Sequence, residues 1–219
     1  MNKSDVLQRI RDTGLIPVVR AESAELAMRA VEAINAGGVS VLEVTMTVPG
    51  AIGVIEYLAA AFEDKAVIGA GTVLDPETAQ ACIQAGAQFI VSPALNEETI
   101  ALCRANDTAV FPGALTPTEV VRAWNAGADA VKVFPAGALG GASYLKALKA
   151  PLPRIELIPT GGVSLKTAAD FIKAGAMALG VGADLVDLKA LREGNEGLIT
   201  ERARQFIEIV QVARAEMTS

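Results

Sequence analysis

Two charged residues stand in segments whose other residues are typical of buried strands. Glu43 lies in the apolar run 40–44, and Lys132 lies in the apolar run 129–134. Because the neighbours of each residue alternate to the opposite face of its strand, both charged side chains should point into the protein interior. A lone buried charge is costly, so these residues form either an ion pair without a function or a catalytic pair.

A desolvated lysine near a carboxylate is suited to Schiff-base chemistry. Burial disfavours the ammonium form of an amine, and the free amine attacks a carbonyl carbon. The resulting iminium is an electron sink, so an adjacent carbon becomes acidic or a nearby C–C bond can break. A carboxylate moves the protons and assists the loss of water from the carbinolamine. Lys132 and Glu43 are therefore the predicted catalytic residues, and this chemistry requires no metal and no cofactor.

The composition excludes other mechanisms and partners. Among the 219 residues there is no histidine, which excludes Ser-His-Asp and Cys-His catalysis and His-ligated metal sites. Two cysteines are too few for a zinc site or a disulfide framework. The net charge of −6 and the aromatic content of 4% indicate neither the basic footprint nor the stacking surface of a nucleic-acid-binding protein.

Length and local composition favour a cytoplasmic protein with a single domain over 1–219. Hydrophobic residues make up 52% of the chain, enough for one large core. The segment 1–12 is charged and amphipathic and lacks the apolar core of a signal peptide. Since no apolar run reaches the roughly 18 residues that span a bilayer, no membrane partner is expected.

Short apolar runs alternate with helical patterns along the whole chain. The predicted strands are 16–19, 40–44, 66–69, 88–92, 108–111, 129–134, 155–158 and 177–181. The predicted helices are 24–36, 50–62, 76–85, 97–105, 117–126, 142–149, 165–174 and 200–216. Strands joined by helices must run parallel, and apolar strands of this kind are covered on both faces. The pattern predicts an α/β fold, a (β/α)8 TIM barrel with an extra N-terminal helix at 2–12 that covers the bottom of the barrel.

Local motifs support this topology. An open doubly wound sheet is the alternative, but the first strand is not followed by the glycine-rich turn of that fold. Thr116 and Glu119 form a predicted capping box at a helix start, and Pro117 between them is the first-turn proline. Glycines that end helices in the left-handed conformation recur in 35–44, 84–91, 125–133 and 173–181.

Chemistry in a parallel barrel takes place at the carboxyl ends of the strands. After the third strand, Gly69 and Gly71 let a substrate approach the backbone, and the Thr72 hydroxyl can donate to a carboxylate. An ordinary strand-to-helix turn explains the same residues.

Two glycine turns predict an anion site. Gly161 and Gly162 follow the seventh strand and Gly182 follows the eighth, and each turn should open a helix. Backbone amides there form a nest, and barrels often bind phosphate after these two strands. Arg20, at the end of the first strand, either pairs with a carboxylate or phosphate of the substrate or forms a surface salt bridge.

Six longer motifs follow one another along the chain. They are LEVTMTVPGA (42–51), IGAGTVLD (68–75), FIVSPALN (89–96), FPGALTPTE (111–119), AVKVFPA (130–136) and IPTGGV (158–163). As an ordered set they resemble the 2-keto-3-deoxy-6-phosphogluconate aldolase family, whose members are often also described as 4-hydroxy-2-oxoglutarate aldolases. The resemblance extends from about residue 5 to residue 215.

This resemblance implies a homotrimeric (β/α)8 barrel, a class I aldolase mechanism and a small-molecule keto acid as substrate. It makes Lys132 the Schiff-base lysine and Glu43 the general acid and base. Thr72 then binds the carboxylate of pyruvate, and Pro93 and Phe134 line the pocket. The positions of the polar tail and phosphate are taken by Arg20, Gly161, Gly162 and Gly182.

Three positions bear on the substrate within this family. Thr47 stands where some members have arginine, so anchoring of the carboxylate rests more on Thr72 and backbone amides. Ala183 replaces the serine usual after the last glycine turn, which removes a hydroxyl donor worth on the order of 1 kcal/mol. Thr160 matches the phosphogluconate branch, whereas the phosphogalactonate branch tends to have an apolar residue there.

The predicted reaction is reversible cleavage of 2-keto-3-deoxy-6-phosphogluconate into pyruvate and glyceraldehyde 3-phosphate. The alternatives within the family are cleavage of 4-hydroxy-2-oxoglutarate into pyruvate and glyoxylate, and the phosphogalactonate-directed reaction. A phosphosugar isomerase or epimerase explains the glycine turns but not the inward lysine. A barrel scaffold without catalysis is a further alternative, and the missing histidines disfavour a metal-dependent aldolase.

Overall fold

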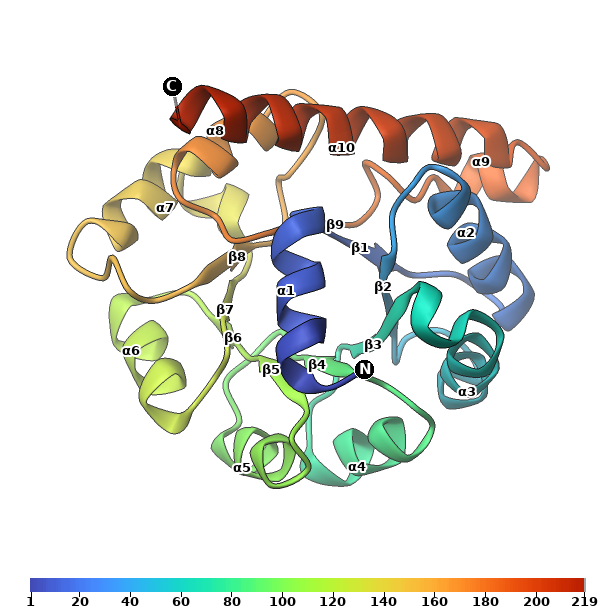
Figure 1. The fold of residues 1–219 in the computed structure, drawn as a ribbon, viewed down its shortest axis with the longest axis horizontal. Coiled ribbons are helices and arrows are strands. Elements are labelled where there is room, and N and C mark those ends of the chain that lie inside the picture. The colour runs from blue at the N-terminus through green and yellow to red at the C-terminus, as the bar shows by residue number, and fades with distance from the viewer. Residues whose placement is uncertain (219) are drawn as a thin grey trace.

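The computed structural model describes residues 1–218 and contains a ring of parallel strands inside a layer of helices (Figure 1). The strands are β1 (Leu15–Val19), β2 (Val41–Thr45), β3 (Val67–Gly71), β4 (Phe89–Val91), β5 (Ala109–Phe111), β6 (Gly113–Ala114), β7 (Val131–Val133), β8 (Leu157–Pro159) and β9 (Leu179–Val181). Two parallel sheets, in the orders β5-β4-β3-β2-β1-β9 and β6-β7-β8, make up the ring. A parallel bridge between Thr160 and Gly180 joins β8 to β9.

The ring has the eight-fold repeat of a (β/α)8 barrel because β5 and β6 together take one place in it. Pro112 separates these two strands, and its carbonyl oxygen accepts a hydrogen bond of 2.9 Å from the Lys132 amide on β7. A proline cannot donate to a ladder, so Pro112 separates β5, which lies within the predicted strand 108–111, from β6, which is not predicted. The predicted fold class is confirmed, and the open doubly wound sheet is wrong.

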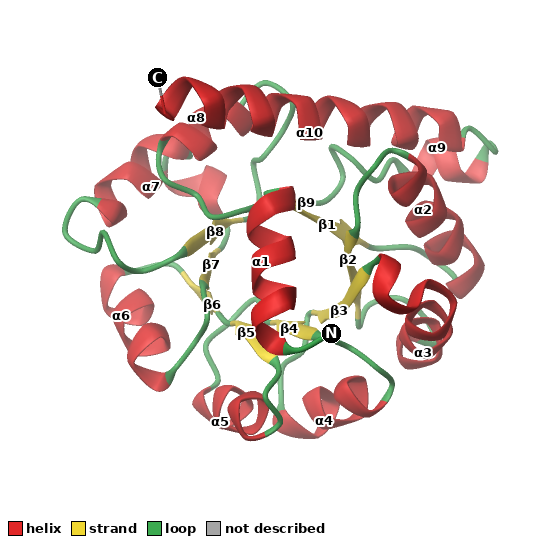
Figure 2. Cartoon of the chain, viewed as in Figure 1, coloured by secondary structure: helices red, strands yellow, loops and turns green. Residues whose placement is uncertain are grey.

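The helices surround the ring as predicted, with differences at some ends (Figure 2). They are α1 (Lys3–Thr13), α2 (Ala24–Ala36), α3 (Ala51–Phe62), α4 (Pro76–Gln84), α5 (Glu97–Ala105), α6 (Pro117–Ala126), α7 (Ala142–Lys149), α8 (Ala168–Lys173), α9 (Leu188–Arg192) and α10 (Glu196–Thr218), with short 3-10 turns η1 (Glu63–Lys65) and η2 (Ala136–Leu139). The boundaries predicted for α2, α5, α6 and α7 are confirmed. The helix predicted at 165–174 begins only at Ala168, and the short helix α9 is not predicted.

The capping motifs explain why several boundaries are sharp. The Glu119 carboxylate accepts a hydrogen bond of 2.8 Å from the Thr116 amide, and the Thr116 hydroxyl accepts one of 3.4 Å from the Glu119 amide. This pair is the predicted capping box. The glycines of the four Ala-Gly exits, Gly38, Gly86, Gly127 and Gly175, have φ between 92° and 101°, where only glycine is free of strain.

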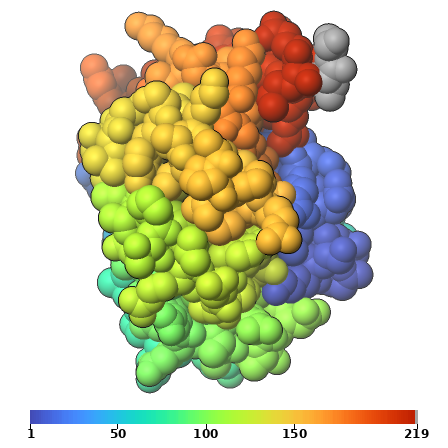
Figure 3. All heavy atoms as spheres, turned by 90° about the vertical axis from the view of Figure 1, so that its left-hand side faces the viewer, coloured from blue at the N-terminus to red at the C-terminus, as the bar shows by residue number. Residues whose placement is uncertain are grey.

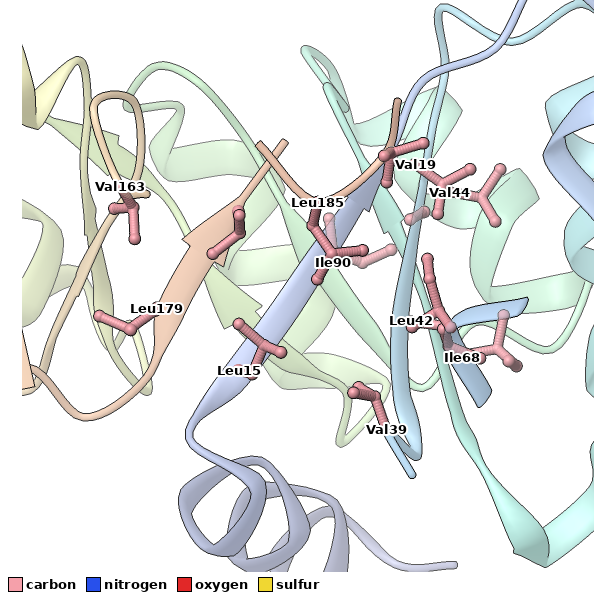
Figure 4. Packing of buried hydrophobic residues seen from close by; sticks show 14 of the residues in the cluster. Leu15, Val19, Val39, Leu42, Val44, Ile68, Ile90, Val163, Leu179 and Leu185 are labelled. Carbon is pink, nitrogen blue, oxygen red and sulfur yellow. The ribbon is translucent and has the colours of Figure 1, made fainter. Parts of the chain in front are cut away.

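Two apolar cores lie on the two faces of the ring. The outer core packs the strands against the helices, and Figure 4 shows part of it around Leu15, Leu42 and Ile68. The inner core fills the ring itself and includes Val41 and Phe89. Because side chains alternate along a strand, Glu43 shares the inner face with Val41, two residues before it.

Helix α1 closes the amino-terminal end of the ring. Its Val6 and Ile10 are buried in the inner core, and its Lys3 forms an ion pair of 2.9 Å with Asp129, before β7. In Figure 1 this helix lies across the centre of the ring, and in Figure 3 it stands at one edge of the molecule. The predicted cover of the barrel bottom is confirmed, which leaves the carboxyl ends of the strands as the open end.

The C-terminal helix α10 packs along one side of the barrel against α2 and α8 (Figure 1). An ion pair between Arg29 of α2 and Glu196 fixes the start of this helix. Throughout residues 1–218, none of the helices has both the length and the apolar character needed to cross a membrane.

Candidate active site

Glu43 lies on β2 and Lys132 on β7, and these two strands stand on opposite sides of the ring (Figure 1). Their exposed fractions are 2% and 3%, which is exceptional for charged residues. The Lys132 Nζ lies 5.4 Å from the centre of the Phe134 ring, within the range of a cation–π contact. Burial and the parity of both strands therefore turn the two predicted catalytic side chains into the ring.

The Glu43 carboxylate is desolvated and incompletely partnered. Its Oε1 is buried and has no hydrogen-bond partner. Burial raises the pKa of Glu43, and the positive charges of Lys132 and Arg20 oppose this shift by smaller amounts. Within residues 1–218 no ion pair joins Glu43 to Lys132, so the interpretation of the two residues as a structural salt bridge finds no support.

A cavity of about 190 Å³ opens at the ends of β1, β7, β8 and β9. Phe134, whose ring lies 5.4 Å from the Lys132 Nζ, lines it, whereas Glu43 and Lys132 themselves do not. Six of the predicted binding residues line it: Arg20, Phe134, Thr160, Gly161, Gly162 and Gly182. We call it the distal cavity. Arg20 is exposed and has no ion pair within the described part of the chain. The alternative that Arg20 forms a surface salt bridge therefore finds no support.

The glycine turns differ from the prediction in one respect. Gly161 and Gly162 have φ of 83° and 81°, the left-handed conformation that turns successive amides toward a common point. However, the turns do not open helices directly, since α8 begins at Ala168 and α9 at Leu188. Any anion bound here meets the turn amides rather than a helix N-terminus. A Cβ at Gly162 would lie 2.7 Å from the Cα of Gly137, so close packing of η2 also requires glycine.

The remaining predicted residues follow the strands on the other side of the ring. Thr72 comes directly after β3 and has φ of 59°, a strained conformation for a β-branched residue. Thr47 is exposed after β2, and its hydroxyl lies 2.6 Å from that of Thr45. Pro93 follows β4 and is half-buried, and its backbone lies against Gly113 of β6. None of these three residues lines the distal cavity.

Some residues at this end of the barrel are not among the predicted site residues. Asp184 and Val18 also line the distal cavity. A second, polar cavity of about 500 Å³ adjoins it at Ala183 and Asp184 and includes Lys166. Gly180 of β9 lines the distal cavity as well. A Cβ at Gly180 would lie 3.1 Å from the Cβ of Thr160, and a glycine inside a strand is the sequence signal for such a close approach.

The fold and the site define an enzyme of the (β/α)8-barrel class with a buried lysine and a buried carboxylate at its open end. Residues 6–202 match the model of the aldolase family described as KDPG and KHG aldolase. The chain belongs to this family, and the resemblance seen in its motifs is confirmed. It is therefore a lyase of the aldolase type.

Individual relatives agree with this assignment. The chain is 35% identical over 210 residues to the 2-dehydro-3-deoxy-phosphogluconate aldolase of Treponema pallidum, across 95% of this chain and 97% of that one. It is 39% identical over 172 residues to the 2-dehydro-3-deoxy-6-phosphogalactonate aldolase of Escherichia coli, across 78% and 83%. The solved structure of the KDPG aldolase of Legionella pneumophila, with pyruvate captured as a covalent carbinolamine, has 32% identity and a TM-score of 0.84, across 93% and 97%.

Proposed function

We propose that this chain is a class I aldolase that reversibly cleaves 2-keto-3-deoxy-6-phosphogluconate into pyruvate and glyceraldehyde 3-phosphate. The observation that carries the proposal is the pair of buried charges, Lys132 and Glu43, which point into the ring without forming an ion pair. The names of the relatives support the substrate class. The carbinolamine trapped in the Legionella enzyme is the kind of intermediate that the proposed mechanism requires.

The reaction begins at Lys132. Its ε-amine adds to the C2 carbonyl of the keto acid, and loss of water from the carbinolamine gives the iminium. Glu43 takes the proton of the C4 hydroxyl, the C3–C4 bond breaks, and its electron pair forms the enamine while the aldehyde leaves. Glu43 then returns the proton to C3, and water hydrolyses the iminium to release pyruvate and the free amine.

The environment of Glu43 suits a proton shuttle. Because burial raises the pKa of this carboxyl, the Glu43 carboxylate is a stronger base than an exposed carboxylate. A base of this kind both removes the hydroxyl proton and returns it to carbon within one cycle.

The substrate is held in two halves. In the pyruvate half, Thr72 and nearby backbone amides bind the carboxylate, Thr47 lies beside them, and Pro93 and Phe134 line the pocket. In the other half, the distal cavity holds the polar tail and phosphate. Its contributors are Arg20, Thr160, Gly161, Gly162 and Gly182.

Two other substrates are tied to particular residues. Ala183 lines the distal cavity and offers no hydroxyl, which favours an aldehyde without phosphate, such as the glyoxylate released from 4-hydroxy-2-oxoglutarate. The identity of 39% to the phosphogalactonate enzyme favours the epimeric substrate. Thr160 favours the phosphogluconate substrate over that epimer.

The setting of the enzyme is part of the proposal. We infer that one barrel over 1–219 carries the whole activity, that the protein acts in the cytoplasm, and that it forms a homotrimer, as the family resemblance implies. Light scattering coupled to size-exclusion chromatography measures the trimer directly, because a protomer of 22.6 kDa gives three times that mass.

Borohydride trapping tests the mechanism. Reduction in the presence of pyruvate should leave a pyruvyl adduct that peptide mass spectrometry finds on Lys132. The variant Lys132→Ala should lose the adduct, and the matched variant Lys189→Ala, at an exposed lysine on α9, should retain it. An unmodified wild-type protein, or an adduct that survives Lys132→Ala, contradicts the proposal.

Pyruvate release from a panel of keto acids identifies the substrate. The panel contains 2-keto-3-deoxy-6-phosphogluconate, its galactonate epimer and 4-hydroxy-2-oxoglutarate, and the first should give the highest kcat/KM. An isomerase or epimerase would be insensitive to borohydride. A scaffold would bind pyruvate but release none from any member of the panel.

A further inference from the structure

Gly71, the last residue of β3, lies against the Glu43 side chain. A Cβ built on Gly71 would lie 2.7 Å from Cγ and 2.5 Å from Cδ of Glu43, and closer still to Oε1. Carbon atoms in favourable contact are about 3.5–4.0 Å apart. The carboxylate of Glu43 therefore occupies space that any side chain at position 71 would fill.

The backbone of Gly71 does not itself require glycine. Gly71 is not among the residues with positive φ, so alanine could adopt the same conformation without strain. The strand is also held in place, because β3 pairs with β2, where Thr45 is opposite Gly71, and with β4 on its other side. With the backbone fixed, a methyl group at this position must displace the Glu43 side chain.

The direction of that displacement follows from the packing. Below Glu43, toward α1, the ring is filled by buried side chains such as Val41, Val67 and Phe89. The carboxylate can therefore move only toward the open end. There it would be better solvated and would lie at a different distance from Lys132.

We propose that Gly71 is a positioning residue of the aldolase reaction, because its missing side chain creates the space that holds the Glu43 carboxylate beside the reacting carbons. This inference rests on the proposed function of Glu43. It differs from the sequence-based interpretation of the same glycine, in which the gap admits substrate to the backbone.

Gly69 provides a matched control on the same face of the same strand. A Cβ on Gly69 would overlap with the ring of Phe89, which packs against Phe111 in the inner core. The three atoms nearest to that Cβ all belong to the Phe89 ring, so alanine there disturbs first the apolar packing, two residues away from Gly71. Both variants add one methyl group to β3, so their difference isolates the effect on the acid.

The experiment compares wild type, Gly71→Ala and Gly69→Ala by kcat, by the pH dependence of kcat/KM and by thermal unfolding. For Gly71→Ala we expect kcat to fall about 100-fold, the effect of a misplacement near 1 Å. The acidic limb of its profile should move to lower pH, because the carboxylate moves to a better solvated place. Desolvation, which raises the pKa of Glu43, outweighs the opposing charges of Lys132 and Arg20 in the wild type. For Gly69→Ala the unfolding temperature should fall, with the acidic limb unchanged.

A Gly71→Ala enzyme with the kcat and acidic limb of the wild type overturns the inference. Stability gives a second test that holds even if this variant folds poorly. Truncation in Glu43→Ala removes the three atoms nearest to the methyl group, so Gly71→Ala should cost much less stability in that background than in the wild type. Equal costs in both backgrounds also overturn the inference.

Failure of the positioning role of Gly71 can be distinguished from failure of the proposed aldolase function. If the wild type releases no pyruvate from any keto acid and traps none on Lys132, the proposed function fails, whereas the stability comparison still decides whether Gly71 makes room for Glu43. If the wild type is an active aldolase and Gly71→Ala matches it, only the positioning role fails.

Discussion

Replacing Glu43 by glutamine separates the effect of its charge from the effect of its shape. Glutamine has nearly the same volume, so the space beside Gly71 remains filled and the fold is retained. The wild-type carboxylate has a buried Oε1 without a hydrogen-bond partner. A charge in such a place destabilises the folded state, and its removal should therefore stabilise the protein while it abolishes the proton shuttle.

The stability effect has a defined pH dependence. Because burial raises the pKa of Glu43 above its ordinary value of 4.5, the folded chain binds this proton more tightly than the unfolded chain. Below 4.5 both states are protonated, and the carboxyl costs the folded state no charge burial. As the pH rises through the folded-state pKa, the unfolded state loses its proton first, and the wild type loses stability. The variant Glu43→Gln has no such loss.

Above that window the variant Glu43→Gln should be more stable than the wild type by about 1–3 kcal/mol, the usual cost of an unsatisfied buried group. Its kcat should fall by about 10²- to 10⁴-fold, the contribution of a positioned acid or base. Urea unfolding at a series of pH values measures the first effect, and pyruvate release measures the second. A stability difference that does not grow with pH, or a variant that keeps its turnover, would refute the reasoning.

Three further variants test other parts of the structure. Arg20→Ala should raise KM for a phosphorylated keto acid about 10- to 100-fold, because it removes a hydrogen bond from a charged donor. In the same steady-state assays, KM for 4-hydroxy-2-oxoglutarate should stay nearly unchanged. Thr72→Gly keeps the left-handed backbone and removes the hydroxyl, so half-maximal borohydride trapping should require about 10-fold more pyruvate. Thr116→Ala should cost about 1 kcal/mol in urea unfolding through loss of the capping box, with no change in kcat.

Most of the fold follows from local signals in the sequence. The helices at 24–36, 97–105, 117–126 and 142–149 have the predicted boundaries because periodicity and flanking residues agree there. The short helix α9 is missed because its five residues cannot establish a helical period. The helix predicted at 165–174 begins late, since the apolar pattern does not reveal that residues up to Thr167 form a turn.

The site is predictable only in part, and the limit is geometric. Alternation along single strands is enough to turn Glu43 and Lys132 inward, because each strand is buried on both faces. That the buried Oε1 of Glu43 has no hydrogen-bond partner depends on contacts between strands far apart in the sequence, which no local pattern encodes. The close approaches at Gly71 and Gly180 are hidden for the same reason, since the Glu43 side chain on β2 and the Thr160 side chain after β8 lie where a Cβ would be.

The structure of the ring explains how a desolvated acid and a stable scaffold coexist. The lower part is sealed by Val6 and Ile10 of α1 and filled by rings such as Phe89 and Phe111, which stabilise the barrel and exclude water. Glu43 and Lys132 lie above this inner core, so the apolar packing that maintains the fold also raises the pKa of Glu43. Space for the acid is then made by omitting a side chain at one position of the wall rather than by loosening the core. Stability therefore depends on the inner core, and reactivity depends on Glu43 and Lys132 directly above it. A packing defect in the inner core should lower activity only if it admits water or a side chain to the space around Glu43 and Lys132.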